Sequence, residues 1–418
     1  MGFSTYADLA RIPVVRRILV LGLLIRIPMW SAGVVLTLHV VTHLDRSYTE
    51  AGLVEMVLCI ALAVSGPWRG RRLDRVGLRA AIAPSLVVLT VAWSIAPWVG
   101  YWALLGFVAV AGLFVVPTFS VVRQVLIGAV PVEQRTAVLS VDSVVVEFSF
   151  MIGPVLGVAA ATYLPTTVAL MTCQLTAVVG GLALWIDNPS LGQEDDGGGP
   201  SHRVRDWLSP IVVTILALSV AATVILTGED LGTVAALRSM HHTTSIGWVL
   251  ALWGLGSALG GIVYGALRRH PPAAVLLVLL GGSTTLVALG DNRLTFTALL
   301  FVSGFFCAPT ITATIDDLSR AVPASVRGEA MGWHGSALTL GGAAGAPVVG
   351  WAIDHGGWQG GFELAGFLGL AIAMVGLTVQ ALRGSPTVAE ADDSTVPDDP
   401  IGSERLEPVE PVEPRPSQ

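Results

Sequence analysis

Six ionisable side chains within or at the edges of long apolar stretches of this sequence are the leading candidates for chemistry. They are Arg26, Asp142, Glu147, Glu229, Asp230 and His334. An ionised side chain near the centre of a bilayer costs at least about 2.5–3.5 kcal/mol, so a charge there is usually functional and paired. Carboxyl and imidazole groups exchange protons, whereas an Arg guanidinium keeps its charge. The pattern indicates a proton-coupling site and a cavity inside a membrane.

Arg26 is the permanent cation of this set. At 1.5 Å per helical residue it lies about 13 Å beyond Arg17. By the same rise Asp142 lies about 10 Å, and Glu147 about 18 Å, beyond Arg135. We predict that Arg26 pairs with one of these two carboxylates, which stand about 140° apart around a helix, so that one Arg does not serve both. Making and breaking the pair would couple proton uptake to a conformational change, and a fixed pair that only joins two helices is the structural alternative.

The remaining candidates have simpler alternatives. Glu229 and Asp230 follow an apolar span placed at 208–228, where they either line a cavity or are solvated loop residues. His334 either faces the cavity or is packed against a backbone partner. His39 and His43 have the spacing of a helical pair, but no carboxylate or Cys accompanies them at ligand spacing, so no metal site is expected. No nucleotide-binding motif or catalytic constellation is present, which predicts neither a cofactor nor an enzyme.

The elements that position these residues are apolar spans. The chain has 418 residues, 53% hydrophobic and only 13% charged, with a mean hydropathy of +0.73. A soluble domain has about a quarter charged residues, so the composition indicates a polytopic membrane protein. Lone spans in lipid must be helices, each of about 20 residues. Twelve transmembrane helices are predicted, at 17–43, 50–69, 79–98, 102–126, 136–160, 165–186, 208–228, 244–267, 273–290, 294–318, 328–352 and 361–382.

The distribution of Arg sets the expected orientation. All 23 basic residues are Arg, and with a cytoplasmic N-terminus all but four fall on the cytoplasmic side. The exceptions are Arg46, Arg238 and Arg293 outside and Arg26 within the first span. This positive-inside asymmetry predicts that both termini are cytoplasmic. Because the Arg residues are spread over many loops, no nucleic-acid partner is expected.

The two halves of the chain repeat at an offset of 192 residues. Gly112-Leu-Phe-Val-Val-Pro117-Thr118 matches Gly304-Phe-Phe-Cys-Ala-Pro309-Thr310, and Ala129-Val130-Pro131 matches Ala321-Val322-Pro323. Arg135 matches Arg327 at the same offset, and one residue later Gly153-Pro154-x-x-Gly157 is echoed by Ala346-Pro347-x-x-Gly350. Parallel six-helix halves of this kind place a substrate site between them near the midplane.

These observations divide the chain into four parts. Residues 1–186 form the first six-helix half and 208–382 the second, joined by a polar, Gly-rich cytoplasmic linker at 187–207. The acidic, Pro-rich tail at 383–418 is expected to be disordered in the cytoplasm.

The segment Gly70-Arg-Arg-Leu-Asp74-Arg75-Val-Gly77-Leu-Arg79 resembles the loop signature between the second and third helices of the major facilitator superfamily. The resemblance covers about residues 17–382. It implies that Asp74 helps hold the outward-facing state, with Arg75 and Arg123 as partners. The conformational-switch residues are then Gly70, Asp74, Arg75, Gly77, Arg79 and Arg123. The corresponding loop after the eighth helix, at 265–270, has no Asp.

A second motif, Gly153-Pro154-x-x-Gly157, resembles part of a helix-packing motif of drug–proton antiporters, although Ser149 and Val158 stand where that motif has Gly. Its echo contributes Pro347 and Gly350. The stretches Arg26-Ile-Pro28 and Tyr48-Thr-x-Ala-Gly-Leu53 resemble actinobacterial members of the family. The resemblance therefore implies a multi-pass protein of a bacterial cytoplasmic (inner) membrane.

The predicted function is secondary active transport of a small molecule by alternating access, as a monomer in the lipid bilayer. Proton-coupled efflux is the leading interpretation, and proton symport that takes up a small metabolite is the first alternative. The second alternative is a non-transporting membrane sensor or scaffold on the same fold. The chemical identity of the substrate does not follow from the residues.

Overall fold

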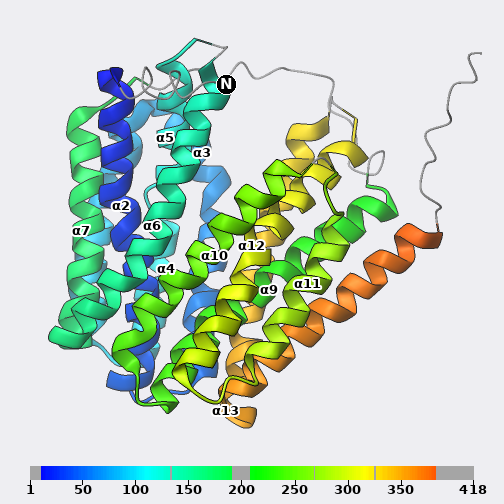
Figure 1. Ribbon diagram of the computed structural model, residues 1–418. Coiled ribbons are helices and arrows are strands. Elements are labelled where there is room, and N and C mark those ends of the chain that lie inside the picture. The colour runs from blue at the N-terminus through cyan, green and yellow to red at the C-terminus, as the bar shows by residue number, and fades with distance from the viewer. Residues whose placement is uncertain (1–10, 132–133, 191–207, 268, 324–325, 383–418) are drawn as a thin grey trace, which may run out of the picture.

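The structure, a computed structural model, describes residues 11–131, 134–190, 208–267, 269–323 and 326–382 (Figure 1). Its described residues are almost entirely helical and contain no strand. The predicted disorder of the tail at 383–418 and most of the predicted linker lie outside the described residues.

The described residues of the first half form six α-helices. They are α2 (Pro13–Leu38), α3 (Tyr48–Ile95), α4 (Tyr101–Leu113), α5 (Thr118–Gly128), α6 (Arg135–Tyr163) and α7 (Thr166–Asp187). A π-helical turn, η1 (His39–His43), extends α2, and a short 3₁₀ turn, η2 (Ala96–Trp98), follows α3. A capping box at Ser47 and Glu50 starts α3, because each side chain accepts a hydrogen bond from the other residue's backbone N–H.

Five α-helices are described in the second half. They are α9 (Pro210–Ser239), α10 (Ile246–Ala266), α11 (Ala273–Val287), α12 (Arg293–Ala321) and α13 (Arg327–Leu382), with the short 3₁₀ turn η4 (Thr243–Ser245) before α10. Glycine breaks two helices that are otherwise continuous. Gly77 in α3 has φ 76° and ψ 172°, and Gly357 in α13 has φ 70° and ψ −178°. This conformation is open essentially only to glycine, so each residue divides its helix into two arms.

Within the part of the chain that the structure describes, ten helical stretches are long and apolar enough to cross a membrane. One of them, Glu329–Val379, is 51 residues long and includes most of the predicted spans 328–352 and 361–382. The predicted span 273–290 corresponds to the shorter apolar helix α11.

Two predicted features were wrong in detail. The predicted span 102–126 corresponds to one apolar stretch, Tyr101–Gly128, but its helix is interrupted between α4 and Pro117, which has no N–H to continue the helix. The predicted span 208–228 ends too early. The helix α9 continues to Ser239, so Glu229 and Asp230 lie inside a regular helix and are not loop residues.

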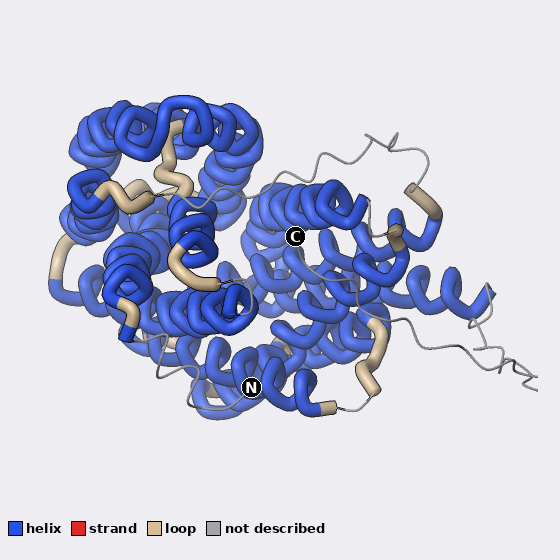
Figure 2. The backbone as a smooth tube through the Cα atoms, turned by 90° about the horizontal axis from the view of Figure 1, so that it is seen from above, coloured by secondary structure: helices blue, strands red, loops and turns tan. Residues whose placement is uncertain are grey.

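The two halves stand side by side as two bundles (Figures 1 and 2). We call the end that holds Asp187 and Pro210 the linker end; it lies at the top of Figure 1. The halves touch near the opposite end, through α3 with α13 and α6 with α10. A Cβ added at Gly52 would lie 2.2 Å from the carbonyl oxygen of Ala346, and one at Gly247 would lie 2.6 Å from the Cα of Val155. The halves therefore meet there backbone against backbone.

Candidate functional site

A buried ion pair joins α2 to α6. The Nη1 of Arg26 lies 2.6 Å from Oδ1 of Asp142, and its Nη2 lies 3.3 Å from Oδ2. Arg26 is fully buried, and its guanidinium also stands 4.8 Å from the ring centroid of Phe119. Of the two carboxylates predicted as partners, the structure pairs Arg26 with Asp142, in the two-pronged geometry that suits a guanidinium. Glu147 lies five residues farther along α6, and its side chain is exposed.

A second buried carboxylate, Glu229 of α9, has a different environment. Its Oε2 accepts a hydrogen bond from the indole N–H of Trp253, at 2.7 Å, and its Oε1 accepts one from the hydroxyl of Thr284, also at 2.7 Å. The hydroxyl of Ser303 donates a third, and the hydroxyls of Ser303 and Thr284 lie 2.9 Å apart. These partners come from α10, α11 and α12, so Glu229 ties four helices of the second half together. All three donors are neutral.

Other carboxylates lie near Glu229. Both Glu229 and Glu55 of α3 are close enough to Asp230 for their charges to act on it. The buried thiol of Cys307 in α12 is likewise under the influence of Glu229, Asp230 and Glu147. Asp230 is exposed, and the charge of Glu55 in the other half acts on it, so its side chain faces the first half. Carboxylates from α3, α6 and α9 thus converge on one region.

His334 of α13 is buried, and its Nε2 lies 2.8 Å from the hydroxyl of Thr314 in α12. It follows Asp142 by 192 residues, the offset at which the halves repeat. The two halves therefore place a buried titratable side chain at equivalent positions, a carboxylate in the first and an imidazole in the second. The partner of His334 is a side-chain hydroxyl instead of the backbone group considered from the sequence.

The switch loop contains residues with different surroundings. Gly77 breaks α3, and Arg79, two residues later, donates hydrogen bonds to the carbonyl oxygens of Trp185 and Ile186 in α7. Arg75 and Arg123 are exposed. Gly70 lies inside α3, but the side chain of Asp74 is outside the described part of the chain. The switching role assigned to these residues stays a prediction.

The residues of the helix-packing motif lie where helices approach closely. Gly153 and Gly157 face α2, since a Cβ at Gly153 would stand 2.5 Å from that of Trp30, and one at Gly157 would stand 2.5 Å from the carbonyl oxygen of Ser31. In the repeated motif a Cβ at Gly350 would lie 2.3 Å from the carbonyl oxygen of Tyr48 in the other half. Pro347 lies within the same helix, α13, beside Gly52. The two glycines of the first motif therefore pack within a half, whereas Gly350 of its echo packs between the halves.

His39 and His43 stack with ring centroids 4.9 Å apart, and the Nδ1 of His39 lies 3.1 Å from the hydroxyl of Thr166. Within the described part of the chain, no three His, Cys, Asp or Glu side chains are grouped as metal ligands.

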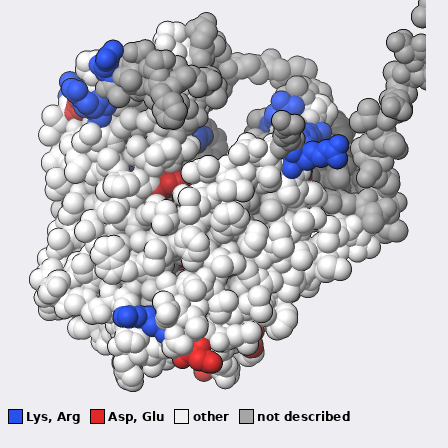
Figure 3. Space-filling model, viewed as in Figure 1, with Lys and Arg blue, Asp and Glu red and all other residues white. Residues whose placement is uncertain are grey.

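Hydrogen bonds between the halves close the end opposite the linker. Asp354 of α13 accepts them from the backbone at the start of α3, and the guanidinium of Arg238 donates one of 2.9 Å to the hydroxyl of Tyr48. Toward the linker end the two bundles diverge (Figure 1), and Figure 3 shows an acidic surface in the notch between them. The space between the halves is thus closed at one end.

Sequence reasoning missed the three donors around Glu229 and the role of Asp354. Apolar spans contain many Ser and Thr residues, and nothing in their spacing shows which of them face one carboxylate. The repeat does not point to Glu229 as a functional residue either, because the position 192 residues earlier is Thr37 and not a carboxylate.

An all-helical bundle pair with apolar spans and carboxylates between its halves defines a membrane protein of the transporter class. The chain matches the Major Facilitator Superfamily over residues 18–237 and 211–408, and it belongs to that family. The prediction of this family from the loop and the repeat is confirmed. No curated protein sequence matches the chain.

Solved structures share the fold at low sequence identity. A mutant form of the nucleoside transporter NupG is 12% identical with a TM-score of 0.74, over 87% of this chain and 99% of that one. A bacterial homolog of the human lysosomal transporter Spinster, inward-facing and occupied, is 12% identical with a TM-score of 0.71, over 89% and 98%. The human organic anion transporter MFSD10 (TETRAN) is 17% identical with a TM-score of 0.57, over 88% and 99%.

Proposed function

We propose that this protein is a proton-coupled secondary transporter that exports a small molecule by alternating access between its two six-helix halves. The observation that carries the proposal is Glu229, a fully buried carboxyl group held by three neutral donors beside Asp230. A carboxyl group can bind and release a proton, whereas Arg26 cannot.

The same geometry supports an arrangement of twelve spans. Gly357 divides the 51-residue stretch Glu329–Val379 into two crossings, and α11 supplies a further short one. Among the described residues, Arg side chains gather at the linker end of both halves (Figure 3), which supports a cytoplasmic position of that end by the positive-inside rule. The closed end then faces outward, and the conformation is inward-facing.

Export can be driven by the proton gradient in this arrangement. In the inward-facing state a substrate reaches the carboxylates from the cytoplasm, and in the outward-facing state protons reach them from outside. Moving one charge through 100 mV yields about 2.3 kcal/mol, which biases a substrate gradient roughly fifty-fold. The hydrogen bonds around Glu229 join four helices, so a change in its protonation acts on all of them at once.

A drug-sensitivity panel in an efflux-deficient bacterial host tests the proposal. Expression of the protein should protect cells against at least one compound, and Glu229→Gln should remove that protection while the protein remains in the membrane at the same level. Asp74→Asn, in the predicted switch, serves as a second variant. Protection that survives Glu229→Gln would contradict the role of this carboxyl group.

Proteoliposomes distinguish coupling from transport. With a compound identified by the panel, wild-type protein should drive transport in response to an imposed pH gradient, and Glu147→Gln should abolish this response while retaining substrate exchange. A pH dependence unchanged by Glu147→Gln would exclude Glu147 from coupling. If expression of the protein made the host more sensitive to a compound, and that compound accumulated in the cells, the result would instead indicate uptake.

A further inference from the structure

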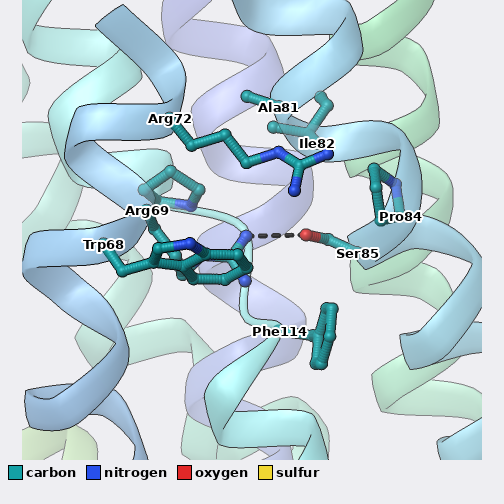
Figure 4. A pocket seen from close by; sticks show the side chains of 9 residues that line it. Trp68, Arg69, Arg72, Ala81, Ile82, Pro84, Ser85 and Phe114 are labelled. Atoms are coloured by element: carbon teal, nitrogen blue, oxygen red, sulfur yellow. Dashed lines mark hydrogen bonds between the residues drawn. The ribbon is translucent and has the colours of Figure 1, made fainter. Parts of the chain in front are cut away.

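A pocket lies at the linker end of the first half, away from the space between the halves. Three parts of the chain form it: the end of the first arm of α3, the start of its second arm, and the break between α4 and α5. Figure 4 shows the lining side chains, with the guanidinium groups of Arg69 and Arg72 converging beside Ser85. Trp68, which is 49% exposed, stands at the mouth.

The side chain of Arg69 supplies a hydrogen-bond donor that the backbone lacks at the break between α4 and α5. Pro117 has no N–H with which to satisfy the carbonyl oxygen of Leu113 four residues earlier. The Nη1 of Arg69 donates to that oxygen at 3.0 Å, and its Nη2 donates to the hydroxyl of Ser85 at 2.6 Å. Arg69 is only 6% exposed, and its Nε has no hydrogen-bond partner.

Arg72, in contrast, makes no hydrogen bond to the helix break. Its guanidinium carbon lies 5.8 Å from the ring centroid of Trp68, and its buried Nε lacks a hydrogen-bond partner. Among the described side chains, no carboxylate pairs with Arg69 or Arg72. Two like charges in a partly buried pocket repel each other, and no carboxylate among the described side chains compensates them.

The second half shows that the fold does not need these cations. At the offset of 195 residues that aligns Gly70 with Gly265, the positions of Arg69, Arg72 and Ser85 are taken by Tyr264, Leu267 and Leu280. There α12 runs unbroken through Pro309, the equivalent of Pro117, and Leu280 is fully buried. The second half fills the equivalent region with uncharged, mostly apolar side chains. The polar pocket is therefore a property of the first half alone.

We propose that this pocket binds a phosphate group through Arg69 and Arg72, supplied by an anionic phospholipid headgroup or by a soluble phosphate. Guanidinium groups match phosphate oxygens with paired, charge-assisted hydrogen bonds. The pocket is narrow, so phosphate oxygens enter it while the rest of the ligand stays outside. An exposed Trp beside a cation at the end of an apolar span is typical of the region where lipid headgroups lie.

The test compares purified full-length variants. Arg72→Gln removes one pocket charge without touching the helix break, and Arg16→Gln removes an exposed charge at the same end of the molecule as the matched control. Native mass spectrometry measures binding of phosphatidylglycerol against phosphatidylcholine. In parallel, the unfolding temperature is followed with inorganic phosphate against chloride at equal ionic strength, since a ligand that binds the folded state raises it.

Wild-type protein and Arg16→Gln should bind equally, and Arg72→Gln should bind about tenfold more weakly. A selective phosphatidylglycerol adduct with this dependence identifies a headgroup site. The same dependence for inorganic phosphate, without a lipid preference, identifies a soluble phosphate. The proposal would be overturned if the wild type bound neither phosphatidylglycerol nor inorganic phosphate. It would also be overturned if Arg72→Gln and Arg16→Gln bound with equal affinity. Arg69→Gln is a second variant, but its loss also leaves the carbonyl of Leu113 without a donor.

Discussion

Asp354 in the last helix caps the start of α3, on the other half of the molecule, through Thr49. Its Oδ2 accepts hydrogen bonds from the backbone N–H of Thr49 at 2.8 Å and from the Thr49 hydroxyl at 2.5 Å, and its Oδ1 accepts one from the N–H of Tyr48 at 2.9 Å. A carboxylate at a helix N-terminus satisfies unpaired N–H groups and suits the helix dipole. This cap exists only while the end opposite the linker is closed, so it stabilises that state specifically.

Replacing Asp354 by Ala should therefore shift the conformational equilibrium toward opening at this end, by roughly tenfold. Spin labels at Tyr163 and His242, exposed residues of the two halves near this end, would report the shift as a larger population of long distances. The labels require a background without Cys59, Cys173 and Cys307.

The neighbouring residue provides the control for this measurement. His355 is exposed, and its Nδ1 contacts only the carbonyl of Trp351 in its own helix. His355→Ala should leave the distance distribution unchanged. Equal distributions for Asp354→Ala and His355→Ala would show that the cap does not stabilise the closed end.

Gly77→Ala should destabilise the folded protein by about 1–3 kcal/mol, because its φ of 76° with ψ 172° is strained for any residue with a Cβ. No atom lies within 4 Å of the added Cβ, so the cost comes from the backbone alone. Gly66→Ala, also in α3 and also in open space but with helical backbone, is the control and should be neutral or slightly stabilising. Thermal unfolding in detergent measures both, and equal unfolding temperatures would contradict the expectation.

Two adjacent glycines in α10 should differ sharply on substitution by Ala. A Cβ at Gly260 would stand 1.7 Å from the carbonyl oxygen of Phe305 in α12, whereas one at Gly261 would stand 3.4 Å from the Cβ of Ala308. Gly260→Ala must move two helices apart and should prevent stable folding, while Gly261→Ala should be tolerated. The yield of monodisperse protein after size-exclusion chromatography separates the two outcomes. A well-folded Gly260→Ala protein would show that α10 and α12 separate at little cost.

The ion pair between Arg26 and Asp142 predicts that substitutions of its two members have strongly non-additive effects on the free energy of unfolding. Asp142→Asn leaves the fully buried Arg26 without its counter-charge and should cost about 3–5 kcal/mol, whereas the double variant Arg26→Gln/Asp142→Asn should cost less than the sum of the single ones. Glu147→Gln, which removes the same charge from an exposed position of α6, is the control and should change stability by less than about 0.5 kcal/mol. Chemical unfolding in detergent gives the four values. Additive losses would mean that the pair contributes no coupling energy.

Much of the architecture was predictable because membranes impose simple constraints on a sequence. Apolar length alone identifies a spanning helix, since a span must satisfy its own backbone hydrogen bonds. The 192-residue repeat identified two similar halves, and the loop at 70–79 identified the family, as the comparison confirmed. The errors came where local rules were too coarse: Pro117 breaks its helix whereas Pro309 does not, and α9 continues past the polar pair Glu229 and Asp230.

Charged residues inside apolar spans were enough to predict buried charges in this protein, and residue type alone shows that Arg26 cannot release its proton. Which groups meet these charges became visible only in the folded chain: Asp142 pairs with Arg26, and three neutral donors on three other helices bind Glu229. Depth in a membrane follows from counting residues along one helix. Contact, in contrast, depends on how each helix is rotated and tilted against its neighbours, which is set by close packing at glycines such as Gly157 and Gly247.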